Sequence, residues 1–426
     1  MSTLIFKPGE TPSSVTRVAV IGLGYIGLPT AAILAGKGLE VIGVDVNAAV
    51  VDAVNQGIVP FVEPDLGIHV AGAVSQGLLS AQLKTPVADA YIVAVPTPFT
   101  TEKTADLKFV QAAAESIAPN LRGGELIILE STSPPGTTQR MADYVLDLRP
   151  DLRASGEGGR TKVMFAHCPE RVLPGRIMIE LVTNDRIVGG LTAEAANVAA
   201  ALYSTFCQGD IHLTDATTAE MAKLVENAYR DVNIAFANEL SMISSKLGID
   251  VWDLIDLANH HPRVNILEPG PGVGGHCIAV DPWFIVAADP TNSSLIRTAR
   301  MVNDSKPAFV EKEVAENLIG LERPTIAALG LAFKANIDDM RESAAVEIVR
   351  RLARSYPEST ILVAAPHEMG LPADLACEAN VHHVETDVAV AEADVVVLLV
   401  DHDRFREIDA RQLHGKRVVD TRGFWR

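Results

Sequence analysis

Cysteine and long apolar runs are both scarce in this 426-residue chain. The four cysteines lie far apart and form no CxxC pair, so we expect neither a disulfide framework nor a bound metal. No apolar run reaches the roughly 18 residues that span a bilayer. The N-terminus lacks a basic segment followed by an apolar core, so we expect no signal peptide. Together these features predict a cytoplasmic protein with reduced thiols and no membrane partner.

Positive charge is also in short supply. The 36 basic residues face 54 acidic ones, which gives a net charge of -18. Such a balance argues against a nucleic-acid surface, although it leaves room for local basic pockets that bind an anionic ligand. The hydrophobic content of 48% is ordinary for a globular protein. A chain of this length should fold into roughly two or three domains.

The first half of the chain alternates short apolar runs with helical patterns. A buried strand at 17–24 is followed by a helix at 25–38 and a second strand at 39–47. Further strand-like runs lie at 90–98, 125–133, 162–170 and 185–190. Apolar strands separated by helices predict a parallel sheet that is covered by helices on both faces.

A helical pattern replaces this alternation near Asp215. Thr217 and Glu220 have the spacing of a capping box, and we expect the helix to end at Gly248. The alternation resumes after Pro324. The predicted fold is α/β, with two Rossmann-like, doubly wound parallel-sheet domains joined by a central helical region. The expected bounds are 1–212, 213–320 and 321–426.

The motif Gly22-x-Gly24-x-x-Gly27 directly follows a strand and opens a helix. The first glycine permits a tight turn, the second lets a pyrophosphate approach, and the third lets helix and strand pack closely. Asp45 ends the next strand, where a carboxylate accepts the ribose hydroxyls of NAD and repels the extra phosphate of NADP. We therefore predict NAD as the cofactor, and consider a purely structural turn the poorer interpretation.

Two threonines follow other strands of this half, Thr97 in VPTP and Thr132 in STSPPG. Ligands of an open parallel sheet bind outside the carboxyl ends of its strands. Both hydroxyls are therefore candidates for hydrogen bonds to cofactor or substrate. A turn that satisfies its own backbone is an equally good interpretation.

Lys223, Asn227 and Arg230 share one face of the central helix. Such a face is usually solvated, and the spacing by itself favours that interpretation. A buried lysine here would instead serve as an acid, a base or an oxyanion partner, because desolvation lowers its pKa.

The stretch PGPGVGGHCIAVD, residues 269–281, presents Cys277 after a run of glycines and prolines. A lone cysteine is more often a small buried hydrophobic group than a nucleophile. Thiolate chemistry needs access and stabilising neighbours, and the flexible glycines, His276 and Asp281 could supply them. No further ligands lie at metal-site spacing. We predict an NAD enzyme in which Cys277 is a candidate nucleophile, and assign His276 no role.

The whole chain resembles the UDP-glucose/GDP-mannose dehydrogenase family, which oxidises UDP-sugars at C6, and most closely its UDP-N-acetylmannosamine branch. The blocks that carry the resemblance occur in family order: VAVIGLGYIGLPTAA, ILESTSPPGTT, CPERVLPGR, AEMAKLVENAYRDVNIAFANEL, HPRVNILEPGPGVGGHCIAVDPWFIV, FKANIDDMRES and VVDTRGFWR. It implies an N-terminal NAD-binding domain, a central dimerisation region with the cysteine loop, and a C-terminal UDP-binding domain.

The resemblance also implies a mechanism, a four-electron oxidation of the sugar C6 alcohol to a carboxylate through a cysteine thiohemiacetal and thioester. Cys277 matches the nucleophile and Lys223 the acid/base lysine with Asn227 as its partner, which reverses the solvated-face interpretation. Asp281 matches the carboxylate that assists water. Thr132 matches the threonine that holds a catalytic water, and Glu170 the glutamate of the PE motif.

One departure separates branches of the family, because Pro174 stands where UDP-glucose dehydrogenases carry a second glutamate. That favours a UDP-N-acetylhexosamine substrate, expected to be UDP-N-acetyl-D-mannosamine and oxidised to its uronate for surface polysaccharides. The gluco epimer is the near alternative. A two-electron dehydrogenase of the 6-phosphogluconate or 3-hydroxyacid type is the alternative of another class, and it needs neither Cys277 nor a third domain.

The remaining family contacts carry over residue by residue. Those expected to contact NAD are Gly22, Gly24, Tyr25, Ile26, Gly27, Asp45, Thr97, Thr132 and Arg341. Those expected to contact the substrate are Arg171, Lys223, Asn227, Arg230, His261, Arg263, Gly274, Phe333, Lys334 and Arg422. Several are cationic, as a diphosphate requires. Arg263 is expected to reach the neighbouring subunit's site, which implies a homodimer or higher homo-oligomer.

Overall fold

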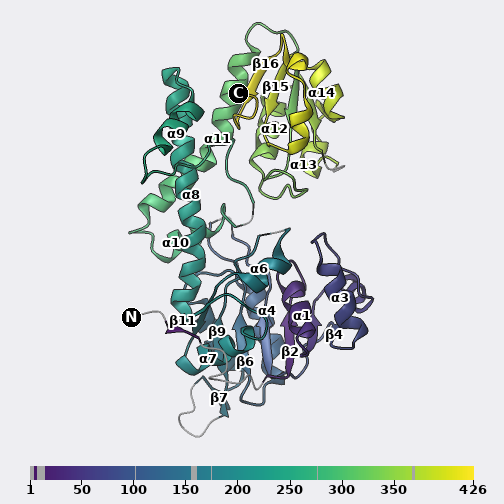
Figure 1. Ribbon diagram of the computed structural model, residues 1–426, viewed down its shortest axis with the longest axis vertical. Coiled ribbons are helices and arrows are strands. Elements are labelled where there is room, and N and C mark those ends of the chain that lie inside the picture. The colour runs from purple at the N-terminus through teal and green to yellow at the C-terminus, as the bar shows by residue number, and fades with distance from the viewer. Residues whose placement is uncertain are drawn as a thin grey trace. The chain divides into compact units, whose positions relative to one another are not determined.

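The computed structural model describes residues 4–6, 15–100, 102–154, 161–173, 175–275, 277–366 and 370–426 (Figure 1). The chain divides into two compact units, Met1–Val225 and Glu226–Arg426. Each unit contains one large sheet with helices on its faces. The division into three domains with the bounds given above stays a prediction.

The first unit is built on a nine-stranded sheet. Its strands, in spatial order, are β1 (Leu4–Ile5), β11 (Ile211–Asp215), β10 (Arg186–Gly190), β9 (Met164–His167), β6 (Leu126–Leu129), β5 (Ala90–Val93), β2 (Arg17–Ile21), β3 (Glu40–Val44) and β4 (Leu79–Gln82). All pairings from β4 across to β9 are parallel, which confirms the predicted parallel sheet. Two pairings, β9 with β10 and β1 with β11, are antiparallel. Two strands were not predicted: β4, whose side chains alternate between buried and exposed, and β11.

Helices cover both faces of this sheet. One apolar core includes side chains of α1 (Gly27–Gly36), α2 (Ala48–Asn55), α3 (Leu66–Ser75), α6 (Ile177–Thr183) and α7 (Ala193–Tyr203). A separate core includes α4 (Lys108–Ile117) and α5 (Thr137–Leu148). Successive strand residues serve the two cores in turn, with Val18 and Val20 in one and Ala19 and Ile21 in the other. This is the predicted doubly wound arrangement. A short pair, β7 (Leu152–Arg153) with β8 (Thr161–Lys162), completes the strands.

The second unit holds a five-stranded sheet in which every pairing is parallel. Its strands, in spatial order, are β14 (Val381–His383), β13 (Thr360–Ala364), β12 (Thr325–Leu329), β15 (Val395–Leu398) and β16 (Arg417–Asp420). The helices are α9 (Val251–Asn259), α10 (Asp281–Ala288), α11 (Ser294–Leu318), α12 (Ala344–Ser355), α13 (Ala373–Ala376) and α14 (Thr386–Glu392). α11 and α12 share one core with the sheet, and α14 lies in another. The second doubly wound domain is therefore confirmed.

The long helix α8 (Ala216–Leu247) belongs to both units, because the division falls after Val225. The predicted capping box at its start is wrong. Asp215, rather than Thr217, accepts the Thr218 N–H at 2.9 Å. The Glu220 carboxylate turns away to α5, as described below. The predicted stop is confirmed, since α8 ends at Leu247 and Gly248 takes a φ of 68°, which only glycine adopts without strain.

Candidate functional site

The three glycines of the N-terminal motif differ in what surrounds them. Gly22 has a φ of +94°, and a Cβ there would lie 2.4 Å from the Ala94 carbonyl oxygen. A Cβ on Gly27 would lie 1.8 Å from the Gly22 carbonyl oxygen. At Gly24, by contrast, a Cβ would meet no atom within 4 Å. The outer glycines are therefore needed by the fold itself, whereas Gly24 leaves open space through which a pyrophosphate could approach the backbone.

Asp45 lies beside this turn. Its Oδ2 accepts the Leu23 N–H at 2.9 Å, and its Oδ1 accepts the Asn47 N–H at 2.9 Å. Each carboxylate oxygen keeps a further lone pair for a ribose hydroxyl. Tyr25 stacks on Phe61 with ring centroids 4.3 Å apart, a neighbour that the sequence analysis did not single out. The turn, the carboxylate and the open glycine fit a dinucleotide. The individual contacts to NAD, including that of Ile26, stay predictions.

Thr97 and Thr132 do lie together. The Thr97 hydroxyl donates to the Thr132 carbonyl oxygen at 2.5 Å, and the Ser131 hydroxyl donates to the Val95 carbonyl oxygen at 2.7 Å. These bonds join the loops that follow β5 and β6. The Thr97 hydroxyl thus donates its hydrogen bond to a backbone carbonyl, as the turn interpretation expects. Its oxygen can still accept a hydrogen bond from a ligand. Thr132 is half-buried.

Glu170 belongs to a buried cluster of charges that the sequence analysis missed. Its Oε2 lies 3.3 Å from Nη2 of Arg186, and its Oε1 accepts the Arg171 N–H at 2.7 Å. Arg186 also lies 3.9 Å from Glu130, which accepts a hydrogen bond from the Tyr203 hydroxyl at 3.2 Å. Burial, together with the charge of Glu170, raises the pKa of Glu130 to about 8. The raised pKa favours the protonated form of Glu130, and Glu170 keeps its ion pair with the arginine.

The antiparallel strand β10 makes this cluster possible. If β10 ran parallel to β9, its first residue would lie at the opposite end of the strands, away from Glu170. Because β10 runs antiparallel to β9, its first residue, Arg186, lies beside the segment that leaves β9 and carries Glu170. The guanidinium also lies 4.7 Å from the ring of Tyr203, within cation–π distance.

A second carboxylate holds the loop after Glu170. Glu63 accepts the N–H groups of Gly175 and Ile177, each at 2.9 Å. Arg171 in the same loop donates to the Asp185 carbonyl oxygen at 3.1 Å. Pro174, on which the choice of branch depends, lies outside the described residues.

Glu220 ties the first turns of α8 to the loop after β6. Its carboxylate accepts hydrogen bonds from Gly136 N–H at 2.5 Å, Thr138 N–H at 2.7 Å and the Thr138 hydroxyl at 2.6 Å. Burial raises the pKa of Glu220, against these bonds. Lys223 follows one turn later on α8 and is half-buried. Within the first unit, Glu220 thereby fixes the part of α8 that carries Lys223 relative to the SPPGTT loop.

Farther along α8, the predicted solvated face is not uniformly solvated. Arg230 is exposed, but Asn227 is half-buried, and its Nδ2 donates to Oδ2 of Asp281 at 2.5 Å. Asp281 begins α10 and is only 2% exposed. The N–H groups of Val280 and Asp281 both donate to the Cys277 carbonyl oxygen, at 3.0 and 2.8 Å. Cys277 begins this turn as an exposed cysteine outside any disulfide, four residues before the buried Asp281. His276 lies outside the described residues.

The glycines before Cys277 are packed against other segments of the second unit. A Cβ on Gly272 would lie 2.8 Å from Ala344 Cβ, and one on Gly274 would lie 2.5 Å from the Glu342 carbonyl oxygen. A Cβ on Gly275 would lie 3.1 Å from the Phe333 ring, and its φ is +84°. The loop is therefore rich in glycine because the neighbouring chain leaves no space for side chains.

Several predicted substrate residues surround this loop. Gly274 packs on Phe333, and a Cβ on Gly270 would lie 2.6 Å from Nη1 of Arg422. Arg422 also pairs with Asp401 at 3.1 Å. Arg341, assigned to NAD, accepts the Gly275 N–H at its carbonyl oxygen at 3.3 Å and pairs with Asp339 through its guanidinium. Lys334 is exposed.

The other two predicted substrate residues lie in the turn after α9. His261 and Arg263 are both exposed there, and His261 Nδ1 accepts the Arg263 N–H at 3.3 Å. Neither forms a hydrogen bond or ion pair with the described residues of the cysteine loop. Their assignment to the substrate, and that of Arg263 to a neighbouring subunit, stays a prediction.

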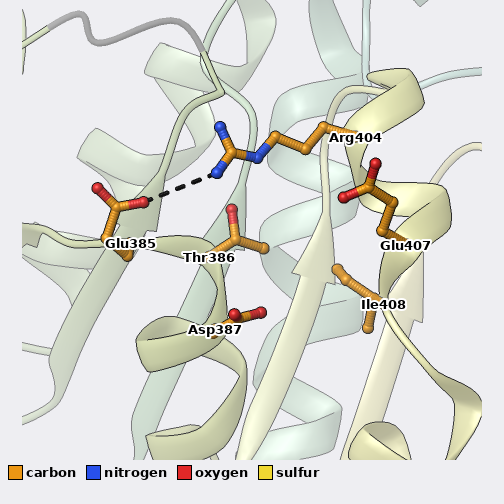
Figure 2. Close-up of a pocket in the computed structure, with 6 residues that line it drawn as sticks. All are labelled: Glu385, Thr386, Asp387, Arg404, Glu407 and Ile408. Carbon is orange, nitrogen blue, oxygen red and sulfur yellow. Dashed lines mark ion pairs between the residues drawn. The ribbon is translucent and has the colours of Figure 1, made fainter.

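A small hollow in the second unit is lined by Glu385, Thr386, Asp387, Arg404, Glu407 and Ile408 (Figure 2). Figure 2 shows Arg404 reaching toward Glu385, and the closest charged atoms of these two residues are 4.0 Å apart. Three carboxylates and one guanidinium line the hollow, so its net negative charge disfavours binding of a diphosphate. None of the predicted substrate residues lines this hollow, so it does not compete with the cysteine loop as the site.

Within the described ranges, no group of three or more His, Cys, Asp or Glu side chains could hold a metal ion. Among the same residues, no helix has the length and apolar character needed to cross a membrane.

Comparison with known proteins covers nearly the whole chain. Residues 16–207 match the NAD binding domain of the UDP-glucose/GDP-mannose dehydrogenase family. Residues 217–305 match the central domain of that family, and residues 327–426 match its UDP binding domain.

Two relatives illustrate the similarity in sequence. An NDP-N-acetyl-D-galactosaminuronic acid dehydrogenase of Ralstonia nicotianae is 54% identical over 409 residues, which is 96% of each chain. A UDP-N-acetyl-D-mannosamine dehydrogenase of Salmonella typhi is 52% identical over 422 residues, 97% of this chain and 100% of the relative. Among solved structures, a UDP-D-ManNAc dehydrogenase from Pyrococcus horikoshii is 37% identical, covers 96% of each chain and has a TM-score of 0.86.

Proposed function

Because the chain belongs to the UDP-glucose/GDP-mannose dehydrogenase family and is thus an NAD-dependent UDP-sugar 6-dehydrogenase, we propose that it oxidises a UDP-N-acetylhexosamine, with Cys277 as the nucleophile. The net reaction converts the C6 alcohol, two NAD⁺ and one water into the carboxylate, two NADH and three protons. The observation that carries the proposal is the exposed Cys277 one turn before a buried Asp281 that accepts a hydrogen bond from Asn227.

A nucleophile has a clear purpose in such a reaction. NAD accepts one hydride from C6 in each of the two oxidations. After the first, the Cys277 thiolate attacks the aldehyde carbon and forms a thiohemiacetal, which cannot leave before the second oxidation gives a thioester. Water then attacks the thioester carbonyl, the C–S bond breaks, and the thiolate returns. Asp281 takes the proton from that water, a proposal that is supported by the hydrogen bond through which Asn227 orients one of its oxygens.

The first unit supplies the remaining proposed groups. Lys223 takes the proton of the C6 alcohol and afterwards stabilises the oxyanion of the adduct. Thr132 orients the attacking water with its hydroxyl. Glu170, kept paired with Arg186, helps to activate the same water. The cationic side chains Arg171, Arg230, Lys334 and Arg422 suit the diphosphate.

The preferred sugar is proposed to be UDP-N-acetyl-D-mannosamine, as the relatives from Salmonella typhi and Pyrococcus horikoshii support. The galactosaminuronate relative gives a second candidate, the galacto sugar. The manno and gluco sugars differ at C2, and the gluco and galacto sugars at C4. Steady-state assays with all three UDP sugars decide between them. A kcat/KM highest for the gluco or galacto sugar overturns the manno assignment.

A homodimer is proposed as the working form. α8 exposes Tyr229, Phe236, Ile243 and Leu247 at spacings that bring them to one side of the helix. A second copy of the chain would cover this apolar face, and Arg263 would reach the partner's site. Light scattering in solution tests the dimer. Cytoplasmic location and a place in polysaccharide synthesis stay predictions.

The chain offers a matched control for the nucleophile. Cys277 and Cys377 are both exposed cysteines of the second unit, and neither forms a disulfide. Cys277→Ser should abolish overall turnover to the uronate while UDP-sugar binding survives, because serine is a far weaker nucleophile at neutral pH. Cys377→Ser should leave the rate unchanged. Full activity of Cys277→Ser would refute the proposed mechanism.

A further inference from the structure

We propose that Asn238 is a positioning residue that fixes the entry of the cysteine loop, residues 270–281, and that Asp231 and Asn303 set the direction in which its amide points. This inference rests on the proposed function of Cys277. It concerns side chains of α8 and α11 that touch neither cysteine nor substrate.

Both ends of the cysteine loop are tied to the same helix. At the exit, Asn227 of α8 donates to Asp281 at 2.5 Å. At the entry, Oδ1 of Asn238, also on α8, accepts the Gly270 N–H at 2.8 Å. The two asparagines lie roughly 16 Å apart along the helix axis, at 1.5 Å per residue. The helix therefore acts as a rigid frame for the loop that carries Cys277.

The direction of the Asn238 amide follows from a chain of hydrogen bonds. Asp231 offers Asn303 only acceptors, its carbonyl oxygen at 3.0 Å and its Oδ1 at 2.8 Å. Asn303 must therefore turn its NH₂ toward Asp231, which leaves its Oδ1 as an acceptor. That oxygen accepts Nδ2 of Asn238 at 2.8 Å. The Oδ1 of Asn238 is consequently directed at Gly270, whose N–H is a donor.

Burial prevents these amides from adopting the reverse orientation. Asp231 and Asn238 are 0% exposed and Asn303 is 1% exposed, so solvent does not substitute for a lost partner. Arg300, also 0% exposed, pairs with Asp231 and holds the acceptor end of the chain in place. Reversing any amide would set acceptor against acceptor inside the protein.

The rest of the loop has little freedom of its own. Beyond Gly270 the backbone lies against Ala344 of α12 and against Phe333, where a Cβ on Gly272 or on Gly274 would come within 2.8 and 2.9 Å of a side-chain atom. Backbone that is this closely packed has little room to absorb a displacement at Gly270. Such a displacement would be passed along the backbone to Cys277.

Asn238→Asp tests this without changing shape. The carboxylate still accepts the Gly270 N–H but opposes Oδ1 of Asn303. Asn317→Asp is the matched control, since Asn317 donates to the Glu313 carbonyl oxygen of its own helix α11 at 2.9 Å. The readouts are kcat and KM, the thermal unfolding midpoint, and the iodoacetamide alkylation rates of Cys277 and Cys377 by peptide mass spectrometry. Cys377 serves as an internal reference in the same chain.

We expect Asn238→Asp to lower kcat at least about tenfold in folded protein, as small misplacements of reacting groups do. The Cys277:Cys377 alkylation ratio should shift by about threefold or more, because access and local charge set thiol reactivity. A folded variant with both quantities within about twofold of the parent and of the control overturns the inference. So does a kcat that falls only with the folded fraction while the ratio is constant, which would mark a merely structural residue.

Amide hydrogen exchange of the parent protein covers the case in which the variant does not fold. Slow exchange at Gly270, despite its place in a loop, supports the bond to Asn238, and exchange at the rate of an open loop contradicts it. A failure of the proposed function can be told apart from a failure of this inference. A shifted alkylation ratio with unchanged kcat supports the role of Asn238 and counts against Cys277 as the nucleophile.

Discussion

Arg186→Met should destabilise the protein far more than the loss of an ion pair at the surface. Arg186 and Glu170 have side chains only 5% and 8% exposed, with 3.3 Å between charged atoms. Arg17 and Glu40 in the same unit are closer, at 2.6 Å, but 44% and 48% exposed. Distance alone would rank the surface pair as the stronger one. Burial reverses the ranking, because removing one partner of a buried pair leaves an uncompensated charge.

The expected magnitudes are well separated. Breaking a buried pair costs about 3–5 kcal/mol, and Glu130 adds a second acid to the same cluster. An exposed pair contributes about 0–1 kcal/mol. Urea unfolding followed by circular dichroism compares Arg186→Met with Arg17→Met. A loss below about 1 kcal/mol for Arg186→Met, or equal losses for the two variants, would refute the reasoning.

Three further outcomes follow from the same structure. Gly274→Ala should reduce kcat by at least about tenfold in steady-state assays, because its Cβ would lie 2.5 Å from a carbonyl oxygen; normal turnover would show that the loop adapts. Mixing Arg263→Ala with Cys277→Ala, each inactive alone, should restore up to about a quarter of the activity if sites are shared across a dimer, whereas no recovery contradicts sharing. Burial lowers the pKa of His167 to about 3, from 6.5. Its contribution to stability is therefore complete above pH 6.5 and lost as the pH falls toward 3, by up to about 1.4 kcal/mol per unit. His167→Phe should flatten this slope in unfolding measured between pH 4 and 7, and an unchanged slope would count against the buried neutral imidazole.

The sequence predicted the fold well where the signals are local. Apolar runs such as Leu126–Leu129 are buried throughout, as a central parallel strand requires, and Gly248 ends α8 as expected. The capping box failed although its motif was present. Asp215 stands nearby and caps better than Thr217, and the loop after β6 offers Glu220 three donors that no local rule anticipates.

The candidate site residues follow from the sequence, and their assignment stays a prediction, whereas their arrangement could not be foreseen. The glycine loop indicated a reactive cysteine, yet the packing of Gly274 on Phe333 joins segments far apart in the chain. The partnership of Arg186 with Glu130 and Glu170 depends on the antiparallel direction of β10, which its apolar sequence does not encode. The assignment of NAD from Gly22 to Asp45 is confirmed at the level of the cofactor, since the match to the NAD binding domain begins at residue 16.

The central claim is a four-electron oxidation in which one cysteine holds the sugar between two hydride transfers. The most direct test counts the NADH formed per UDP-N-acetyl-D-mannosamine consumed, with limiting sugar and excess NAD, and identifies the product by mass spectrometry. We predict two NADH per sugar and a uronate product. One NADH per sugar, with an aldehyde as the product, would contradict the account.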